Sequence, residues 1–232
     1  MKSTPPADAP IARVPSGVPG LDALIGGGFP QNRTLLVAGD VGTGKTTMGV
    51  QFLVAGARRG ERGILITTDE KPRHIIEDVR RFGWDLDSSE LKDAITVMDA
   101  SPYFTALRGA RKPDANQAAA ALTGEVHRLN ARLLVVDGLT SLVPGGPDAR
   151  RSAGFLAVMI SALEDDHICT AVLTATSATP SEQFTAGALE LLAGPVDGHI
   201  RRSLRVRSLP GVPTGAGDWP MDIVDGQGLI VR

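Results

Sequence analysis

Residues 35–47 read Leu-Leu-Val-Ala-Gly-Asp-Val-Gly-Thr-Gly-Lys-Thr-Thr, and this stretch decides the fold. A short apolar run ends in a loop that fits G-x-x-x-x-G-K-[ST], and the next segment, Met48 to Leu53, has a helical pattern. A strand, a glycine-rich loop and a helix in this order form a phosphate-binding loop. Its glycines let successive backbone N–H groups point at a phosphate, and the helix N-terminus adds its positive dipole. The expected nucleotide contacts are Asp40, Val41, Gly42, Thr43, Gly44, Lys45, Thr46 and Thr47.

Three residues are expected to complete a magnesium nucleotide site. Lys45 should reach the β- and γ-phosphates, and the hydroxyl of Thr46 should hold Mg²⁺. Asp137 ends the apolar run Leu133–Val136, at the carboxyl edge of a buried strand, where open α/β sheets bind ligands. We expect it to order the Mg²⁺ shell opposite Thr46. The alternative role for Asp137 is that of a turn or helix-capping aspartate.

A pair of acids supplies the candidate catalytic groups. Asp69 and Glu70 follow the apolar run Gly63–Thr68, which is expected to be the next strand. A carboxylate beside the γ-phosphate can orient and deprotonate an attacking water, so Glu70 is the expected general base and Asp69 its helper or a Mg²⁺-shell group. The alternative is a solvated acidic turn before Lys71.

Composition limits the class of protein. The 232 residues carry a formal net charge of −2, so the whole chain has no general attraction for nucleic acid or acidic membranes. The single cysteine, Cys169, lies in an apolar run and is expected to be a buried, inert thiol, which suits a reducing cytoplasm. No apolar run approaches the length of a membrane span, and the proline-rich residues 1–10 are expected to be a disordered tail.

Strand and helix patterns alternate along the chain. This alternation predicts an α/β fold with a mostly parallel sheet covered by helices on both faces. The helix over Asn116–Arg128 is expected to be interrupted or weakened at Gly124, and a helical stretch is expected near Ala186–Leu192. Residues 200–209 look like a half-exposed strand, and residues 221–231 predict a final antiparallel β-hairpin.

The chain resembles the RecA-superfamily ATPases of the KaiC type, which are close to RadA. Residues 13–30, Arg-Val-Pro-Ser-Gly-Val-Pro-Gly-Leu-Asp-Ala-Leu-Ile-Gly-Gly-Gly-Phe-Pro, resemble the family leader T-G-I-P-G-L-D-x-L-L-G-G-G-L-P. The resemblance continues through Gln51-Phe52-Leu53, the acid pair at residues 69–70, Phe82–Leu86 and Leu134–Asp137. It implies one RecA-like three-layer domain over residues 11–232, ATP with Mg²⁺, and a homo-oligomeric, usually hexameric, ring with nucleotides between subunits.

One departure from the family bears on the rate of hydrolysis. Family members carry a strand R-x-L-x-V-x-K-x-R-G, whose Lys and Arg reach the neighbouring subunit's γ-phosphate. In an ungapped alignment these positions are Ser208 and Pro210, and proline carries no positive charge. Arg205 or Arg207 could substitute if the register shifts. Because a trans arginine is worth about 10³-fold or more in rate, slow or partner-dependent hydrolysis is expected.

Four functions remain open from the sequence. The leading one is an ATPase whose ring assembly depends on ATP and which acts in signalling or regulation with a protein partner. The second is a non-hydrolysing ATP-dependent scaffold. A DNA-binding ATPase has little support, since of the two loops expected at the ring centre one carries only Arg150 and Arg151 and the other no basic residue. Autokinase activity is the fourth, with Ser177, Thr179 and Ser181 as available acceptors.

Overall fold

The computed structural model describes residues 11–68, 70–100, 114–139, 149–165, 169–176, 185–196, 198–213 and 217–232, with the side chains of residues 149–153, 155 and 156 excepted. The predicted tail, Asp69 and most of the two loops expected at the ring centre, near residues 144–151 and 176–185, lie outside this part of the chain. The helices are α1 (Leu21–Leu24), α2 (Lys45–Arg58), α3 (Pro72–Val79), α5 (Ala115–Leu129) and α7 (Ala149–Asp165), with a 3₁₀ turn, η1 (Arg80–Phe82), after α3. The strands are β1 (Arg13–Val14), β2 (Phe29–Pro30), β3 (Thr34–Gly39), β4 (Gly63–Thr67), β5 (Ile95–Asp99), β6 (Leu133–Asp137), β7 (Thr170–Ala175), β8 (Gly187–Val196), β9 (His199–Ser208), β10 (Asp218–Val224) and β11 (Gly228–Val231).

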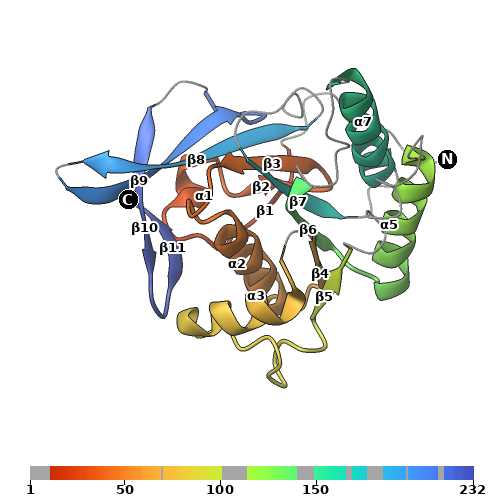
Figure 1. The fold of residues 1–232 in the computed structure, drawn as a ribbon, viewed down its shortest axis with the longest axis horizontal. Coiled ribbons are helices and arrows are strands. Elements are labelled where there is room, and N and C mark those ends of the chain that lie inside the picture. The colour runs from red at the N-terminus through yellow and green to blue at the C-terminus, as the bar shows by residue number, and fades with distance from the viewer. Residues whose placement is uncertain are drawn as a thin grey trace.

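Within the described residues, one sheet of nine strands runs through the molecule in the order β11-β10-β9-β8-β3-β7-β6-β4-β5 (Figure 1). The six strands from β8 to β5 pair in parallel, and β9, β10 and β11 continue the sheet with antiparallel pairs. The predicted parallel sheet and its antiparallel C-terminal hairpin are therefore confirmed. Because the parallel strands share one direction, the carboxyl ends of β3, β4 and β6 meet at one edge.

Helices cover both faces of the parallel part. α2 and α3 lie on one face, where Val50 and Phe52 of α2 pack with Val37 and Val135 of the sheet. α5 and α7 lie side by side over the other face, where Val126 packs with strand residues such as Leu36 (Figure 1). Successive strand residues thus enter opposite cores, which explains the near-continuous apolar runs.

The N-terminal leader, residues 13–30, contacts both the phosphate-loop helix α2 and the C-terminal strand β11. The backbone N–H of Val231 on β11 donates to Pro19 O at 2.9 Å, and the Gln51 side chain of α2 donates to Gly17 O at 2.9 Å. A Cβ on Gly20 would lie 2.0 Å from Val231 O, so the leader needs glycine to approach β11 this closely. The leader is therefore part of the packing around α2.

One expectation about secondary structure is wrong. Residues 186–192 do not form a helix, because residues 187–196 form β8 between β3 and β9. Ala, Leu and Glu favour a helix locally, but pairing with strands on both sides overrides that preference. Of the two alternatives at Gly124, interruption is excluded, because α5 runs unbroken past it. An exposed glycine in a helix costs about 1 kcal/mol relative to alanine, so weakening without a break is what remains. The expected burial of Cys169 is confirmed, and desolvation raises the pKa of its thiol to about 12.

Candidate active site

The phosphate-binding loop follows β3 and leads into α2, as the sequence predicts. Gly44 occupies the N-cap of α2 with φ +107°, a left-handed conformation that glycine adopts without steric cost. A Cβ there would also lie 2.8 Å from Cδ1 of Ile223 on β10. The backbone conformation and the nearby Ile223 side chain both require glycine at residue 44. The short distance to Ile223 also shows that β10 packs directly against the loop.

The Lys45 ammonium lies inside the loop. It donates to the carbonyl oxygens of Gly39 and Asp40 at 2.7 and 2.8 Å. Partial burial lowers the pKa of Lys45, and the carboxylates of Asp137 and Asp40 oppose that shift. Lys45 is therefore held at the position from which it can exchange two neutral carbonyls for a polyphosphate.

The Thr46 hydroxyl donates to Oδ2 of Asp137 at 2.8 Å, so the two predicted magnesium groups touch across α2 and β6. Thr174, at the end of β7, donates its hydroxyl to the other carboxylate oxygen, Oδ1, at 2.5 Å. The Thr174 hydroxyl in turn accepts from the backbone N–H of Gly138 at 2.9 Å, which fixes its orientation. Thr174 thus orients the carboxylate so that Oδ2 faces Thr46. A hydroxyl and a carboxylate oxygen side by side are the hard oxygen ligands that Mg²⁺ takes, and the residues fit the expected ion.

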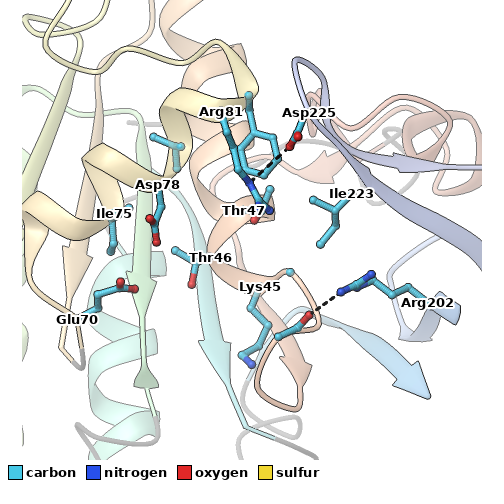
Figure 2. A pocket seen from close by; sticks show the side chains of 14 residues that line it. Lys45, Thr46, Thr47, Glu70, Ile75, Asp78, Arg81, Arg202, Ile223 and Asp225 are labelled. Atoms are coloured by element: carbon cyan, nitrogen blue, oxygen red, sulfur yellow. Dashed lines mark hydrogen bonds and ion pairs between the residues drawn. The ribbon is translucent and has the colours of Figure 1, made fainter. Parts of the chain in front are cut away.

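Glu70 faces the same cavity from the segment after β4 (Figure 2). The pKa of Glu70 is raised, first by desolvation and then by the negative charges of Asp78 and Asp137, while His74 lowers it. A raised pKa makes the carboxylate a stronger base for a water proton. The sequence motifs did not indicate that Asp78, on α3, lies near Glu70. Asp69 lies outside the described residues.

A cavity of about 460 Å³ joins these groups. Besides Asp78, its lining includes three further charged residues that the sequence motifs did not indicate, Arg202 of β9, Arg81 of η1 and Asp225 of the β10–β11 turn (Figure 2). Arg202 Nη2 lies 3.4 Å from Gly42 O, and within the described part of the chain its buried Nε has no hydrogen-bond partner. The sequence does contain a signal for Arg202. It lies two residues before Leu204, whose side chain is buried, so the two side chains point to the same face of β9.

Arg205 and Arg207 lie on the opposite side of β9 from Arg202, since side chains alternate along a strand. Arg205 makes a bidentate bond to Asp218, Nε to Oδ1 at 2.6 Å and Nη2 to Oδ2 at 2.8 Å. Arg205 and Arg207 also reach Glu190 Oε2, at 3.2 and 3.3 Å. The pairing with Arg205 lowers the pKa of Asp218. These arginines are thus engaged within the chain, and their contact with a neighbouring subunit stays a prediction.

Several predicted residues fall where the structure gives no side chain. The acceptor candidates Ser177, Thr179 and Ser181 lie outside the described residues, and the side chains of Arg150 and Arg151 on α7 are likewise not described. In the described ranges, no helix is long and apolar enough to cross a membrane.

Comparison with known proteins assigns the family. A family model described as ATPase: KaiC matches residues 14–232. The chain belongs to the KaiC family of ATPases. The UPF0273 protein PH0284 of Pyrococcus horikoshii is 30% identical over 237 residues, covering 94% of this chain and 93% of its own length.

Two further KaiC relatives agree in sequence and in fold. The circadian clock protein KaiC3 of Synechocystis is 28% identical to this chain. The aligned region covers 95% of this chain and 46% of KaiC3. The crystal structure of the KaiC-like protein PH0186 from Pyrococcus horikoshii superposes with a TM-score of 0.80 at 27% identity, covering 96% of this chain and all of the other. Membership of the KaiC family implies nucleotide binding and a RecA-like core with a phosphate-binding loop.

Proposed function

We propose that this KaiC-family chain hydrolyses ATP slowly, with Mg²⁺, and assembles with copies of itself in an ATP-dependent ring, usually a hexamer in this family. The observation that carries the proposal is that Lys45, Thr46 and Glu70, from α2 and the end of β4, line one cavity. Asp137 of β6 accepts a hydrogen bond from the Thr46 hydroxyl beside it. We further propose a cytoplasmic role in signalling or regulation through a protein partner.

The chain's own groups divide the work of phosphoryl transfer. Lys45 and the loop N–H groups would bind the β- and γ-phosphates, with Arg202 as an additional cation from β9. Thr46 and Asp137 would hold Mg²⁺, which neutralises charge on the phosphate oxygens when bound. Glu70 would orient the attacking water and accept its proton, and its raised pKa favours that acceptance.

We expect slow hydrolysis because β9 and the segment after it lack two cations that family members carry there. Ser208 and Pro210 stand where family members place a Lys and an Arg, and the Arg205 guanidinium is bonded to Asp218 within the chain. Pro210 is held in place by Arg13, whose Nη2 donates to the Pro210 carbonyl and whose Nη1 donates to Gly28 O at 3.0 Å. A neighbouring subunit with these residues offers less positive charge to the γ-phosphate. We therefore expect most of the roughly 10³-fold rate enhancement that a trans arginine contributes to be absent.

The test measures oligomer mass by light scattering and phosphate release in the same samples, with ATP–Mg²⁺, with ADP–Mg²⁺ and without nucleotide. We expect a larger assembly with ATP–Mg²⁺ and slow, continuous phosphate release. A single mass in all three conditions together with no phosphate release would contradict the proposal. Assembly on ATP without any release would instead favour a non-hydrolysing scaffold, which the missing trans cations also support.

A further inference from the structure

The segment that carries Glu70 is attached to the end of β6 through the side chain of Thr68. Thr68 follows β4 directly, and its hydroxyl donates to Gly138 O at 2.8 Å, with Asp137 O as a second acceptor at 3.1 Å. The backbone N–H of Thr68 also donates to Asp137 O, at 3.2 Å. The parallel pairing of β4 with β6 ends at Thr67 and Asp137. The contacts of Thr68 therefore extend the connection between the two strands one residue beyond the sheet.

The Gly138 end of this connection belongs to the hydrogen-bond network of the metal site. The N–H of Gly138 donates to the Thr174 hydroxyl at 2.9 Å, and that hydroxyl donates to Oδ1 of Asp137. The other carboxylate oxygen of Asp137 accepts from Thr46. The peptide groups that Thr68 contacts are thus held by the same network that orients the Asp137 carboxylate.

The Glu70 end is fixed by Thr67, the last residue of β4. The buried Thr67 side chain donates its hydroxyl to the backbone carbonyl of Glu70. Thr67 therefore ties Glu70 to the end of β4, and Thr68 ties that strand end to β6. Because a β-branched side chain has few accessible χ1 rotamers, each hydroxyl holds its partner in a narrowly defined position.

The two carboxylates that this connection spaces repel each other. The raised pKa of Glu70 has desolvation as its first cause, followed by the negative charges of Asp78 and Asp137. Like charges favour separation wherever the backbone allows it, and a hydrogen bond between the two strand ends resists that separation. The spacing matters for rate, since a displacement of about 1 Å in a catalytic group can cost roughly 10²-fold.

We propose that Thr68 is a positioning residue for hydrolysis, whose hydroxyl holds the Glu70 segment at a fixed distance from the metal site at Asp137. This inference rests on the proposed ATP hydrolysis with Glu70 as the base. It assigns a role in the rate, and none in nucleotide binding, to a neutral side chain that does not line the cavity.

The test measures the dissociation constant for ATP–Mg²⁺ and phosphate release at saturating ATP in the wild type, Thr68→Val, Thr68→Ser and Thr123→Val. Valine keeps the shape of threonine without the hydroxyl, and serine keeps the hydroxyl. Thr123 is the matched control, because its hydroxyl also contacts two backbone carbonyls, Ala119 O at 3.0 Å and Ala120 O at 3.3 Å, and it does not line the cavity. We expect Thr68→Val to release phosphate roughly tenfold more slowly with an unchanged dissociation constant. Thr68→Ser should keep most of the rate, and Thr123→Val should match the wild type.

A double variant separates positioning of Glu70 from a general structural effect. In Glu70→Gln the base is already absent, so adding Thr68→Val should cause no further loss of rate. A further tenfold loss in that background would show that Thr68 acts through another group, and it would overturn the inference.

The remaining outcomes are equally decisive. An unchanged rate in Thr68→Val, or a loss that Thr68→Ser does not recover, would refute the inference and leave the proposed function standing. Weaker ATP–Mg²⁺ binding in Thr68→Val would also refute it, because the hydroxyl would then support the nucleotide or metal site itself. A wild type that binds ATP but releases no phosphate would refute the proposed hydrolysis, and this inference with it.

Discussion

Gln51 and Leu229 are joined by a two-way bridge between the phosphate-loop helix and the last strand. The Gln51 amide accepts from Leu229 N at 2.8 Å and donates to Leu229 O at 3.0 Å, and its side chain is buried. The same amide donates to Gly17 O. One side chain of α2 therefore forms hydrogen bonds with backbone groups of both the leader and β11. The position of the β10–β11 turn beside the cavity therefore depends on α2 itself.

Removing this bridge should destabilise the protein strongly. Gln51→Leu keeps the volume but leaves the buried N–H and C=O of Leu229 unpaired, and we expect a loss of about 3 kcal/mol in the free energy of unfolding. Urea denaturation measures it, with Gln117→Leu on the exposed face of α5 as the control. Equal stability of the two variants would show that the bridge contributes nothing.

A side chain at Gly228, at the start of β11, should destabilise the protein. It has φ +83°, and a Cβ would lie 2.4 Å from the Trp84 ring and 2.6 Å from Gln51 Oε1. Gly226 has φ +77° with nothing within 4 Å, so Gly226→Ala carries the conformational cost alone. We expect Gly228→Ala to lower the unfolding free energy by about 1–3 kcal/mol more than Gly226→Ala does, because only residue 228 must displace its neighbours. Thermal or urea unfolding of both variants gives the difference, and equal losses would argue against the tight packing.

Asp137 should matter for the metal more than for the nucleotide. Asp137→Asn keeps the shape and removes the charge beside Thr46, so ATP binding with Mg²⁺ is expected to fall roughly 10–100-fold, the usual cost of losing a group that orients a metal shell. Binding in EDTA should change little. Titration calorimetry under both conditions tests this, with Asp114→Asn, a helix-cap position that asparagine also suits, as control. An equal loss with and without Mg²⁺ would remove Asp137 from the metal site.

The pH dependence of turnover should report Glu70. Its carboxylate acts only when deprotonated, so a raised pKa moves the acid limb of the rate to higher pH than an ordinary glutamate gives. Asp78 contributes to that shift, so Asp78→Asn should lower the pKa of Glu70 and move the acid limb to lower pH. Glu77→Gln, the adjacent exposed acid on α3 that does not line the cavity, is the control. An acid limb that does not move in Asp78→Asn would mean that another group controls it.

The sequence predicts best where chemistry and local structure coincide. The loop at residues 40–47 requires its glycines and lysine locally, and the apolar runs before Asp137 and Glu70 imply buried strands on their own. β8 could not be foreseen, because its Ala-Leu-Glu-Leu-Leu composition favours a helix and only β3 and β9 on its two sides make it a strand.

The remaining site residues escape prediction for a different reason. Arg81 and Asp225 are 144 residues apart, and their meeting depends on the turn after β10 reaching η1. No periodicity encodes that contact. Arg202 is the intermediate case, because an arginine on the buried phase of a strand marks an inward-facing charge that needs a partner.

The most direct test of the account is phosphate release by the wild type and Glu70→Gln, measured at matched ATP occupancy with Mg²⁺. We predict that both proteins bind ATP equally and that turnover falls by roughly 10²-fold or more in Glu70→Gln, since a positioned general base contributes that much. Equal turnover in the two proteins, with ATP bound in both, would contradict Glu70 as the catalytic base.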